Sequence, residues 1–299
     1  MSTLKQFHYF ITIVETGSFS AASAQLFIAQ SALSRQIMLL EDELGFLIFD
    51  RSEKKIKLTT AGDQFYRDIK KQLSALHNTI LSAQNLAKGK GRIFRIAHSS
   101  SVILNKEKLN LFKQLCVQHQ IEIEIETLAS ELQIEAIENG SLDIGFIRPP
   151  VLTSLEKLNH QIIYSSQLCV AMCMEQEQFN PQKVKLTDLK DVPFVSIPHD
   201  ERGGLSYLAA NLCLSHGFSP KPAFIRSRKI SQLQLVSQNL GICIVPQDFE
   251  SVLPHNVRLI ELDNEPYFSS VVLLWKKETD PLLEQCVDHI LKYFSDSKV

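Results

Sequence analysis

The hydrophobic residues of this 299-residue chain change their spacing near residue 90, and this change constrains the fold more than any other feature. Before that point, apolar residues recur at steps of three and four, which is the spacing of amphipathic helices. From Arg92 onward, short strand-like runs alternate with helical stretches. Such a βαβ order predicts a parallel sheet with helices on its faces. We therefore expect a helical N-terminal part and a larger α/β part.

The helical part begins with two helices of unequal length. Apolar spacing over 4–15 predicts the first helix, and Gly17 ends it. A short, alanine-rich helix follows over 21–26, with Ser18 or Ser20 as its N-cap.

A third helix is expected over 30–44, after a tight turn that Phe27 and Ile28 fill. Gly45 follows the helix in the C′ position, where glycine is favoured. This order of helix, turn and helix predicts a helix-turn-helix. Four apolar residues form the buried stripe of the third helix: Leu33, Ile37, Leu40 and Leu44.

Small polar residues occupy the first turns of this third helix, on the side away from its apolar stripe. In a helix-turn-helix those turns enter the major groove of DNA, where arginine can bind guanine and glutamine can bind adenine. The competing interpretation is an ordinary solvated helix face. The predicted DNA contacts of the helix-turn-helix are Ser20, Gln30, Ser31, Ser34 and Arg35.

A two-stranded wing and a long helix are expected next. The stretch FLIFDRSEKKIKLTTAG (46–62) predicts two short strands with SEKK as their turn. Arg51, Lys54 and Lys55 are placed to contact phosphates, although exposed lysines in a turn are common. The helix over 63–87 has a continuous apolar seam, which predicts pairing with a second copy of the chain. The predicted dimerisation residues are Phe65, Ile69, Leu73, Leu76 and Ile80.

Charge and cysteine content agree with a DNA-binding N-terminal part inside the cell. Residues 1–90 carry 11 Lys and Arg against 8 Asp and Glu, although the whole chain has a net charge of −2. The N-terminus does not resemble a secretory signal, and no run is long enough to cross a bilayer. All six cysteines lie beyond residue 90 without a CxxC pair, and we expect buried, reduced thiols in a cytoplasmic protein.

The α/β part is expected to form two lobes with a cleft between them, because two strand-and-helix sets, the second beginning with a strand over 167–174, are joined by extended crossovers. Ligands of such sheets bind beyond the carboxyl ends of the strands. The predicted division is a winged helix-turn-helix (1–60), a linker and dimerisation helix (61–91) and an effector-binding domain (92–299). Within that domain, lobe I comprises 92–161 and 267–299, and lobe II comprises 162–266.

The first 65 residues resemble the DNA-binding domain of LysR-type transcriptional regulators. The matching stretches include GSFSAA (17–22), QSALSRQI (30–37), LEDELG (40–45) and LTTAG (58–62). The resemblance continues more weakly through LDIGFIRPP (142–150) and LVSQNLGICIVP (235–246) to the C-terminus. Two departures are Ser31, where close relatives often carry proline, and Asp50, where many members have glutamate.

The resemblance implies an α+β multidomain regulator: a winged helix-turn-helix, a long linker helix and a two-lobed effector domain like the type 2 periplasmic binding proteins. It also implies a regulator, with activator expected and repressor left open, that assembles as a homodimer or homotetramer on double-stranded promoter DNA. A small molecule in the cleft would then change DNA bending and the recruitment of RNA polymerase.

Carried over by position, the resemblance places an effector site between the lobes. Hydroxyls and helix N-termini in the cleft suit an anion, so we expect a small organic or aromatic acid. Each residue also has a structural interpretation: the serines as caps, Arg148 in a salt bridge and His199 in a solvated loop. The predicted effector-binding residues are Ser99, Ser100, Ser101, Ser130, Arg148, His199 and Arg202.

Alternatives within and outside the family remain at this point. A relative that controls an efflux pump would bind a cationic or amphipathic compound, and a peroxide sensor would need a reactive cysteine such as Cys213. An exported solute-binding protein fits 92–299 but lacks a signal. No GxSxG, HExxH, GxGxxG or Walker motif indicates an enzyme, and we expect neither cofactor nor metal.

Overall fold

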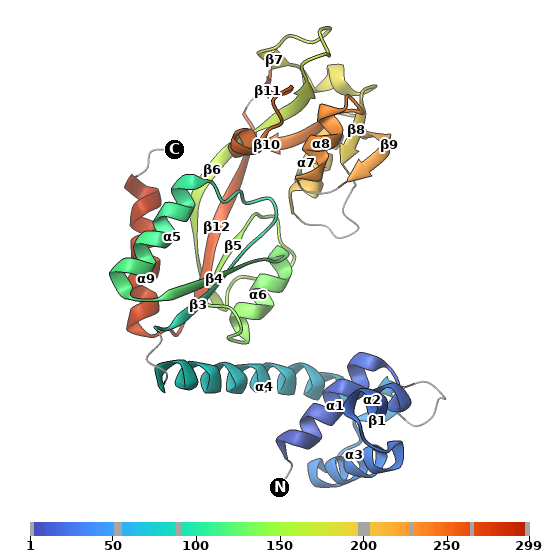
Figure 1. Ribbon diagram of the computed structural model, residues 1–299. Coiled ribbons are helices and arrows are strands. Elements are labelled where there is room, and N and C mark those ends of the chain that lie inside the picture. The colour runs from blue at the N-terminus through green and yellow to red at the C-terminus, as the bar shows by residue number, and fades with distance from the viewer. Residues whose placement is uncertain are drawn as a thin grey trace. The chain divides into compact units, whose positions relative to one another are not determined.

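The computed structural model describes residues 3–50, 56–87, 91–196, 204–227, 230–263 and 266–296 (Figure 1). The chain divides into two compact units, Met1–Leu81 and Ser82–Val299, and each is considered by itself. None of the helices in the described ranges combines the length and the apolar character needed to span a membrane.

The first unit contains the three predicted helices, α1 (Leu4–Thr16), α2 (Phe19–Leu26) and α3 (Gln30–Leu44). Ser18 caps α2, as expected, through a hydrogen bond that its side chain accepts from the N–H of Ala21. Gly45 ends α3 with a left-handed backbone (φ 75°), which confirms the predicted C′ glycine. The predicted order of helix, turn and helix is therefore confirmed.

The predicted apolar stripe of α3 lies in the core of the unit, where Leu33, Ile37 and Leu40 pack with Phe10 of α1. Glu41 lies beside them and is 3% exposed. Its carboxylate accepts hydrogen bonds from the N–H groups of Ile48 (2.9 Å) and Phe49 (3.2 Å), so it satisfies buried backbone donors.

The wing is confirmed as two short antiparallel strands, β1 (Phe49–Asp50) and β2 (Lys57–Leu58). The long helix α4 (Thr60–Ala87) follows. Gly62 lies so close to the wing that an added Cβ would be 2.1 Å from the backbone oxygen of Ile48. A side chain would clash there, which explains why LTTAG ends in glycine.

The seam of α4 divides into two parts with different surroundings. Phe65 stacks on Phe10 (5.7 Å between ring centroids) and makes a T-shaped, edge-to-face contact with Phe7 (5.9 Å). Phe65 therefore packs in the core of its own unit. This packing explains why the residue is apolar, without a dimer contact. Leu76 and Ile80 are 39% and 46% exposed and have no comparable cover in the described residues.

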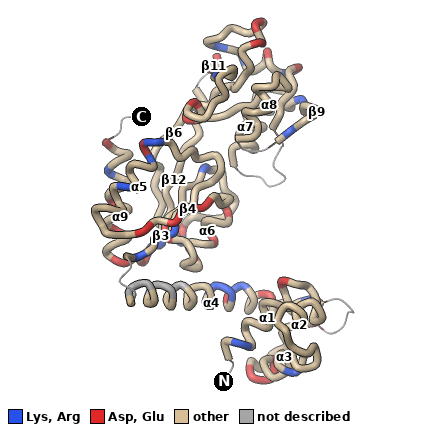
Figure 2. The backbone as a smooth tube through the Cα atoms, in the orientation of Figure 1, with Lys and Arg blue, Asp and Glu red and all other residues tan. Residues whose placement is uncertain are grey.

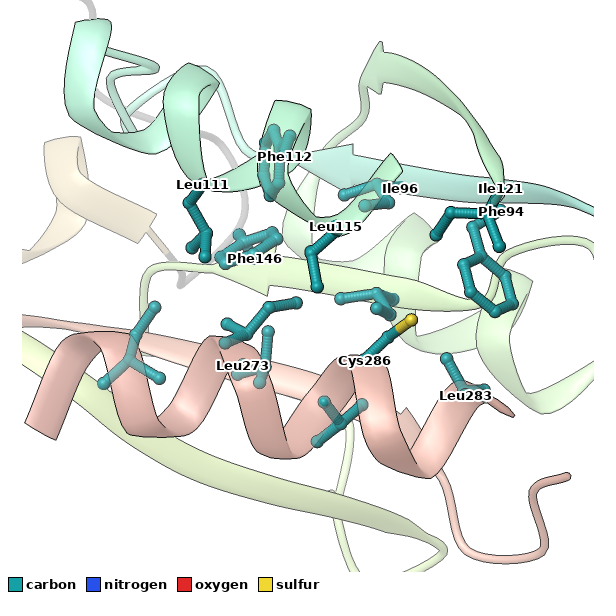
Figure 3. Close-up of a cluster of buried hydrophobic side chains, with 14 of the residues drawn as sticks. Phe94, Ile96, Leu111, Phe112, Leu115, Ile121, Phe146, Leu273, Leu283 and Cys286 are labelled. Atoms are coloured by element: carbon teal, nitrogen blue, oxygen red, sulfur yellow. The ribbon is translucent and has the colours of Figure 1, made fainter. Parts of the chain in front are cut away.

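The second unit begins with the predicted parallel sheet and its covering helices (Figure 1). Strand β3 pairs in parallel with both β4 and β5. Helices α5 and α9 pack together against this sheet around Phe94, Leu111, Phe146 and Leu273 (Figure 3). The elements of this lobe are β3 (Ile93–His98), α5 (Lys106–His119), β4 (Glu122–Thr127), α6 (Ser130–Glu138), β5 (Ile144–Ile147), β12 (Phe268–Lys276) and α9 (Pro281–Asp296).

The long strand β6 (Leu158–Cys173) joins the two lobes. It pairs with β12 from Leu158 to Gln167 and with β10 and β11 from Leu168 onward. The sequence predicted a strand only from Gln167, and β6 also runs through the expected lobe boundary at 161.

The second lobe carries the predicted strands and helices on the other half of β6. Strands β7 and β11 and the two 3-10 helices were not predicted. Its elements are β7 (Lys183–Val184), η1 (Leu186–Leu189), β8 (Pro193–Ser196), α7 (Gly204–Ser215), β9 (Lys221–Ser227), α8 (Ser231–Ser237), β10 (Cys243–Pro246), η2 (Gln247–Val252) and β11 (Val257–Leu262).

Candidate functional site

The polar residues predicted to read DNA lie on the surface of the first unit. Gln30, Ser31 and Arg35 are exposed on the first turns of α3, Ser34 is half-buried, and Ser20 is exposed on α2. Ala29, the N-cap of α3, provides no side-chain hydrogen bond to the helix. The first N–H groups of α3 therefore lack a side-chain cap and carry the positive end of the helix dipole.

The charges of α3 separate along its length (Figure 2). Arg35 lies in the N-terminal half, whereas Glu41, Asp42 and Glu43 lie near the C-terminal end. A polyanion is attracted to the first end and repelled by the second, so this separation favours an approach of DNA to the first turns. The predicted wing contacts Arg51, Lys54 and Lys55 lie outside the described residues.

A cavity of about 190 Å³ lies between the two lobes of the second unit. Five of the predicted effector residues line it: Ser99, Ser100, Ser101, Ser130 and Arg148. The other lobe contributes polar groups that were not predicted, including Ser196, Ser206 and Gln232. His199 and Arg202 lie outside the described residues. Apolar lining comes from Leu128, Val151, Leu152, Leu205, Ala209, Ile244, Val245 and Phe249.

Two helices from opposite lobes begin at the wall of this cavity. Ala129, Ser130 and Glu131 at the start of α6 line one side, and Gly204 and Leu205 at the start of α7 line the other. As in α3, the N-cap of α6 makes no side-chain hydrogen bond to the helix. Helix N-termini attract anions because their N–H groups lack intrahelical partners.

Arg148 lies at the cavity but is fully buried, at 0% exposure. Its Nη2 forms a salt bridge with Oδ2 of Asp248 at 2.7 Å. Its Nε and Nη1 donate to the backbone oxygens of Ser101 (3.1 Å) and Ser269 (3.0 Å). From the sequence, Arg148 was expected either to bind an anionic ligand or to form a structural salt bridge. The salt bridge is present, so much of the positive charge of Arg148 is already compensated.

Two further side chains extend this ion pair into a buried network. Oδ2 of Asp248 also accepts a hydrogen bond from the hydroxyl of Tyr164 (3.1 Å). Nζ of Lys108 donates to that hydroxyl (2.8 Å) and to the backbone oxygen of Ile103 (2.7 Å). The network therefore connects α5, β6 and the residue that follows β5 with η2 of the second lobe.

Burial changes the acidity of two groups in the network. Burial lowers the pKa of Lys108 from 10.5 to about 8, and the positive charge of Arg148 acts in the same direction. The negative charge of Asp248 raises the pKa but does not outweigh burial. Burial also raises the pKa of Tyr164, because the charged phenolate is poorly solvated, and Asp248 adds to the effect. Tyr164 therefore remains a neutral donor to Asp248.

The cysteines do not have the surroundings of reactive thiols. Cys213 is 0% exposed, and burial raises its pKa to about 11. The thiolate is the reactive form, so this environment argues against a peroxide sensor at Cys213. All six cysteines are free, five of them are buried, and the described residues contain no group of three or more His, Cys, Asp or Glu placed to hold a metal ion.

A winged helix-turn-helix with a polar recognition face, together with a two-lobed unit around a polar cavity, defines a ligand-responsive DNA-binding regulator. Comparison with family models supports this class. Residues 4–63 match the bacterial regulatory helix-turn-helix protein model of the lysR family, and residues 96–295 match the LysR substrate binding domain. The chain belongs to the LysR family of transcriptional regulators.

Individual relatives support the same conclusion. The transcriptional regulator BenM of Acinetobacter baylyi is 29% identical over 264 residues, which cover 87% of this chain and 85% of BenM. The crystal structure of full-length CbnR with its target DNA covers 97% of this chain and 99% of CbnR, with 22% identity and a TM-score of 0.72. The BenM effector-binding domain with its effector benzoate covers 69% of this chain and 94% of that domain, with 20% identity and a TM-score of 0.60.

Proposed function

We propose that this protein regulates transcription from a promoter that it binds through residues 1–60, in response to a small organic or aromatic acid in the inter-lobe cavity. The observation that carries the proposal is the cavity itself, in which serine hydroxyls and the N-termini of α6 and α7 surround one space. An oxyanion would be attracted to the hydroxyls and to the N–H groups at the start of α6, whereas at the start of α7 the N–H of Gly204 already donates to the backbone oxygen of Pro150 (2.8 Å).

The lining supports an acid with an apolar body. Ser99, Ser101 and Ser130 offer hydroxyls from one lobe, and Leu205 and Phe249 offer apolar surface from the other. Arg148 adds a positive charge that the ligand would share with Asp248. The benzoate in the effector-binding domain of BenM is an acid of this kind. We propose that His199 and Arg202 complete the site.

The negative charge of Glu131 is relevant to the alternative ligand class, a cationic compound. A cationic compound would need an available carboxylate in the cavity, and Glu131 is the acidic residue among the described lining residues. Its two carboxylate oxygens accept hydrogen bonds from the N–H groups of Leu152 and Thr153. These bonds use two acceptor positions of the carboxylate but leave its negative charge in place, so the preference for an acid rests on the serine hydroxyls and the start of α6.

A thermal-shift experiment on the full chain separates the two classes. Benzoate should raise the melting temperature by mass action, whereas a quaternary ammonium biocide should not. Ser130→Ala should reduce the shift with benzoate, because it removes a hydroxyl at the start of α6. Ser295→Ala, an exposed serine on α9, is the matched control and should respond like the wild type. A shift with the cation but with no organic acid would show that the acid assignment is wrong.

The remaining parts of the function concern assembly. The exposed Leu76 and Ile80 support pairing of α4 with a second copy, giving a homodimer or homotetramer. Such an assembly would present two recognition helices to double-stranded promoter DNA in the cytoplasm and act on RNA polymerase there.

A further inference from the structure

Phe27 lies in the turn between α2 and α3 and points away from the protein. The sequence predicted that it fills a tight turn, but its side chain is 94% exposed. The other phenylalanines in the described part of the first unit all belong to its core: Phe7, Phe10, Phe19, Phe46, Phe49 and Phe65. Phe27 is the exception, and its exposure stabilises nothing within the unit.

The backbone of Phe27 is also unfavourable for this residue type. Phe27 follows α2 in the left-handed conformation, with φ 55° and ψ 42°. Its N–H donates to the backbone oxygen of Ala24, and the N–H of Ile28 donates to that of Ser23. Helices that end in this way favour glycine at this position, because a Cβ is strained there. A bulky residue in a strained conformation indicates a function for the side chain.

The position of Phe27 indicates what the side chain contacts. It is three residues before Gln30, so its Cα lies within about 11 Å of the start of the polar face of α3. In a helix-turn-helix on DNA, the first helix crosses the phosphate backbone and the second enters the major groove. The turn between them therefore lies at the edge of the groove, where the deoxyribose rings are.

The neighbours of Phe27 favour DNA over a protein partner. Among the residues within three positions of Phe27, the exposed ones are small or polar (Ala24, Gln25, Ala29 and Gln30), and the apolar Leu26 and Ile28 are half-buried against the core. The ring is therefore a single apolar group in a polar region, not part of the continuous apolar patch that marks a protein interface. The uncapped start of α3 and Arg35 give this region a positive character, which suits a polyanion.

We propose that Phe27 packs on the sugar–phosphate backbone of bound duplex DNA at the edge of the major groove. The contact adds affinity without sequence information, since deoxyribose is the same at every step. The proposal rests on DNA binding by residues 1–60 and adds a residue that the polar face of α3 does not include.

The test compares Phe27→Gly and Phe27→Asn with wild type, as full chains, on two duplexes. One duplex is selected by the wild-type protein from a random library, and the other is unrelated and of equal length. Both variants should bind each duplex about tenfold more weakly, because burial of part of a phenylalanine is lost. The slope of affinity against salt should not change, because an apolar contact releases no counterions.

The melting temperature of the two Phe27 variants should rise while their DNA affinity falls. Gly and Asn tolerate the left-handed conformation, so both variants should melt at a higher temperature than wild type. Gln120→Gly is the matched control, because Gln120 follows α5 in the second unit with φ 53° and is exposed. It should also raise the melting temperature but leave DNA affinity unchanged.

Three outcomes are informative. If wild type binds the selected duplex and both variants bind equally well, Phe27 does not contact DNA and the proposal is wrong, while DNA binding stands. A loss confined to the selected duplex would indicate a base contact and overturn the assignment to the backbone. If the selection from the random library yields no duplex that wild type binds, the proposed function itself fails.

Discussion

Removal of one partner of the buried ion pair between Arg148 and Asp248 should strongly destabilise the second unit, and Asp248→Asn tests this directly. The substitution keeps the size of the side chain and removes its charge. Arg148 is 0% exposed and would keep only the two backbone oxygens of Ser101 and Ser269 and a neutral amide. A buried cation that loses its counterion typically costs about 3–5 kcal/mol. Because the amide still accepts hydrogen bonds, we expect about 3 kcal/mol.

The assay can use the single tryptophan of the chain. Trp275 lies on β12 and packs against the core around α5 and α9, so its fluorescence reports unfolding of the second unit. Urea slopes of about 1–3 kcal/mol per molar convert the expected loss into a midpoint shift of about 1 M or more.

A pair of further variants separates loss of charge from loss of volume. Arg148→Met should cost as much as Asp248→Asn or more, since it leaves Asp248 without its cation. The double variant Arg148→Met with Asp248→Leu should recover much of that stability, because replacing both buried charges by apolar groups is often neutral. Single variants within 1 kcal/mol of wild type would refute the reasoning, because the pair would then contribute no more than a surface ion pair.

Three other predictions concern DNA, assembly and pH. In a binding titration, Arg35→Ala should weaken the binding free energy for the selected duplex by about 1–3 kcal/mol and relax the preference at one base pair. An equal loss of affinity for random DNA would exclude base reading by Arg35. Leu76→Asp should give smaller species in sedimentation, because a charge in the exposed seam opposes pairing, whereas Asp68→Asn on the same helix should not. The free energy of unfolding should rise by up to about 3 kcal/mol between pH 8 and 10.5, because Lys108 releases its proton at a lower pH in the folded chain than in the unfolded chain. Urea titrations over this pH range measure the rise, and Lys108→Met should abolish it.

Local signals were sufficient to predict most of the helices. Helix α3 was predicted with its bounds because its apolar stripe, its polar start and Gly45 are all encoded within sixteen residues. The early part of β6 was missed because polar residues such as Asn159, His160 and Gln161 interrupt the apolar pattern. Strand β7 has only two residues and carries no periodic signal. Strand β11 (VRLIEL) was not predicted, and its adjacent apolar residues Leu259 and Ile260 break a strict alternation.

Tertiary partners were beyond the reach of local patterns. Asp248 lies 100 residues from Arg148 and 84 from Tyr164, so nothing in the sequence around any of them indicates the network. Phe65 fits the period of a dimer seam, and only the position of α1 shows that Phe10 covers it. Phe27 was expected to be inside a turn because apolar residues usually are, but the left-handed backbone leaves its ring in solvent.

The cavity was predictable for a different reason, which is the direction of the strands. Strands β3, β4 and β5 are parallel, so their carboxyl ends lie at one edge of the sheet. The residues that follow these ends, Ser99, Leu128 and Arg148, all line the cavity. In the other lobe, Ser196 at the end of β8 lines it too. Binding beyond the carboxyl ends of strands is a rule of topology, so the direction of the strands was enough to predict where the cavity lies. What topology does not determine is the charge left for a ligand, because that charge depends on Asp248, a residue of η2 that pairs with Arg148 and is not itself a lining residue of the cavity.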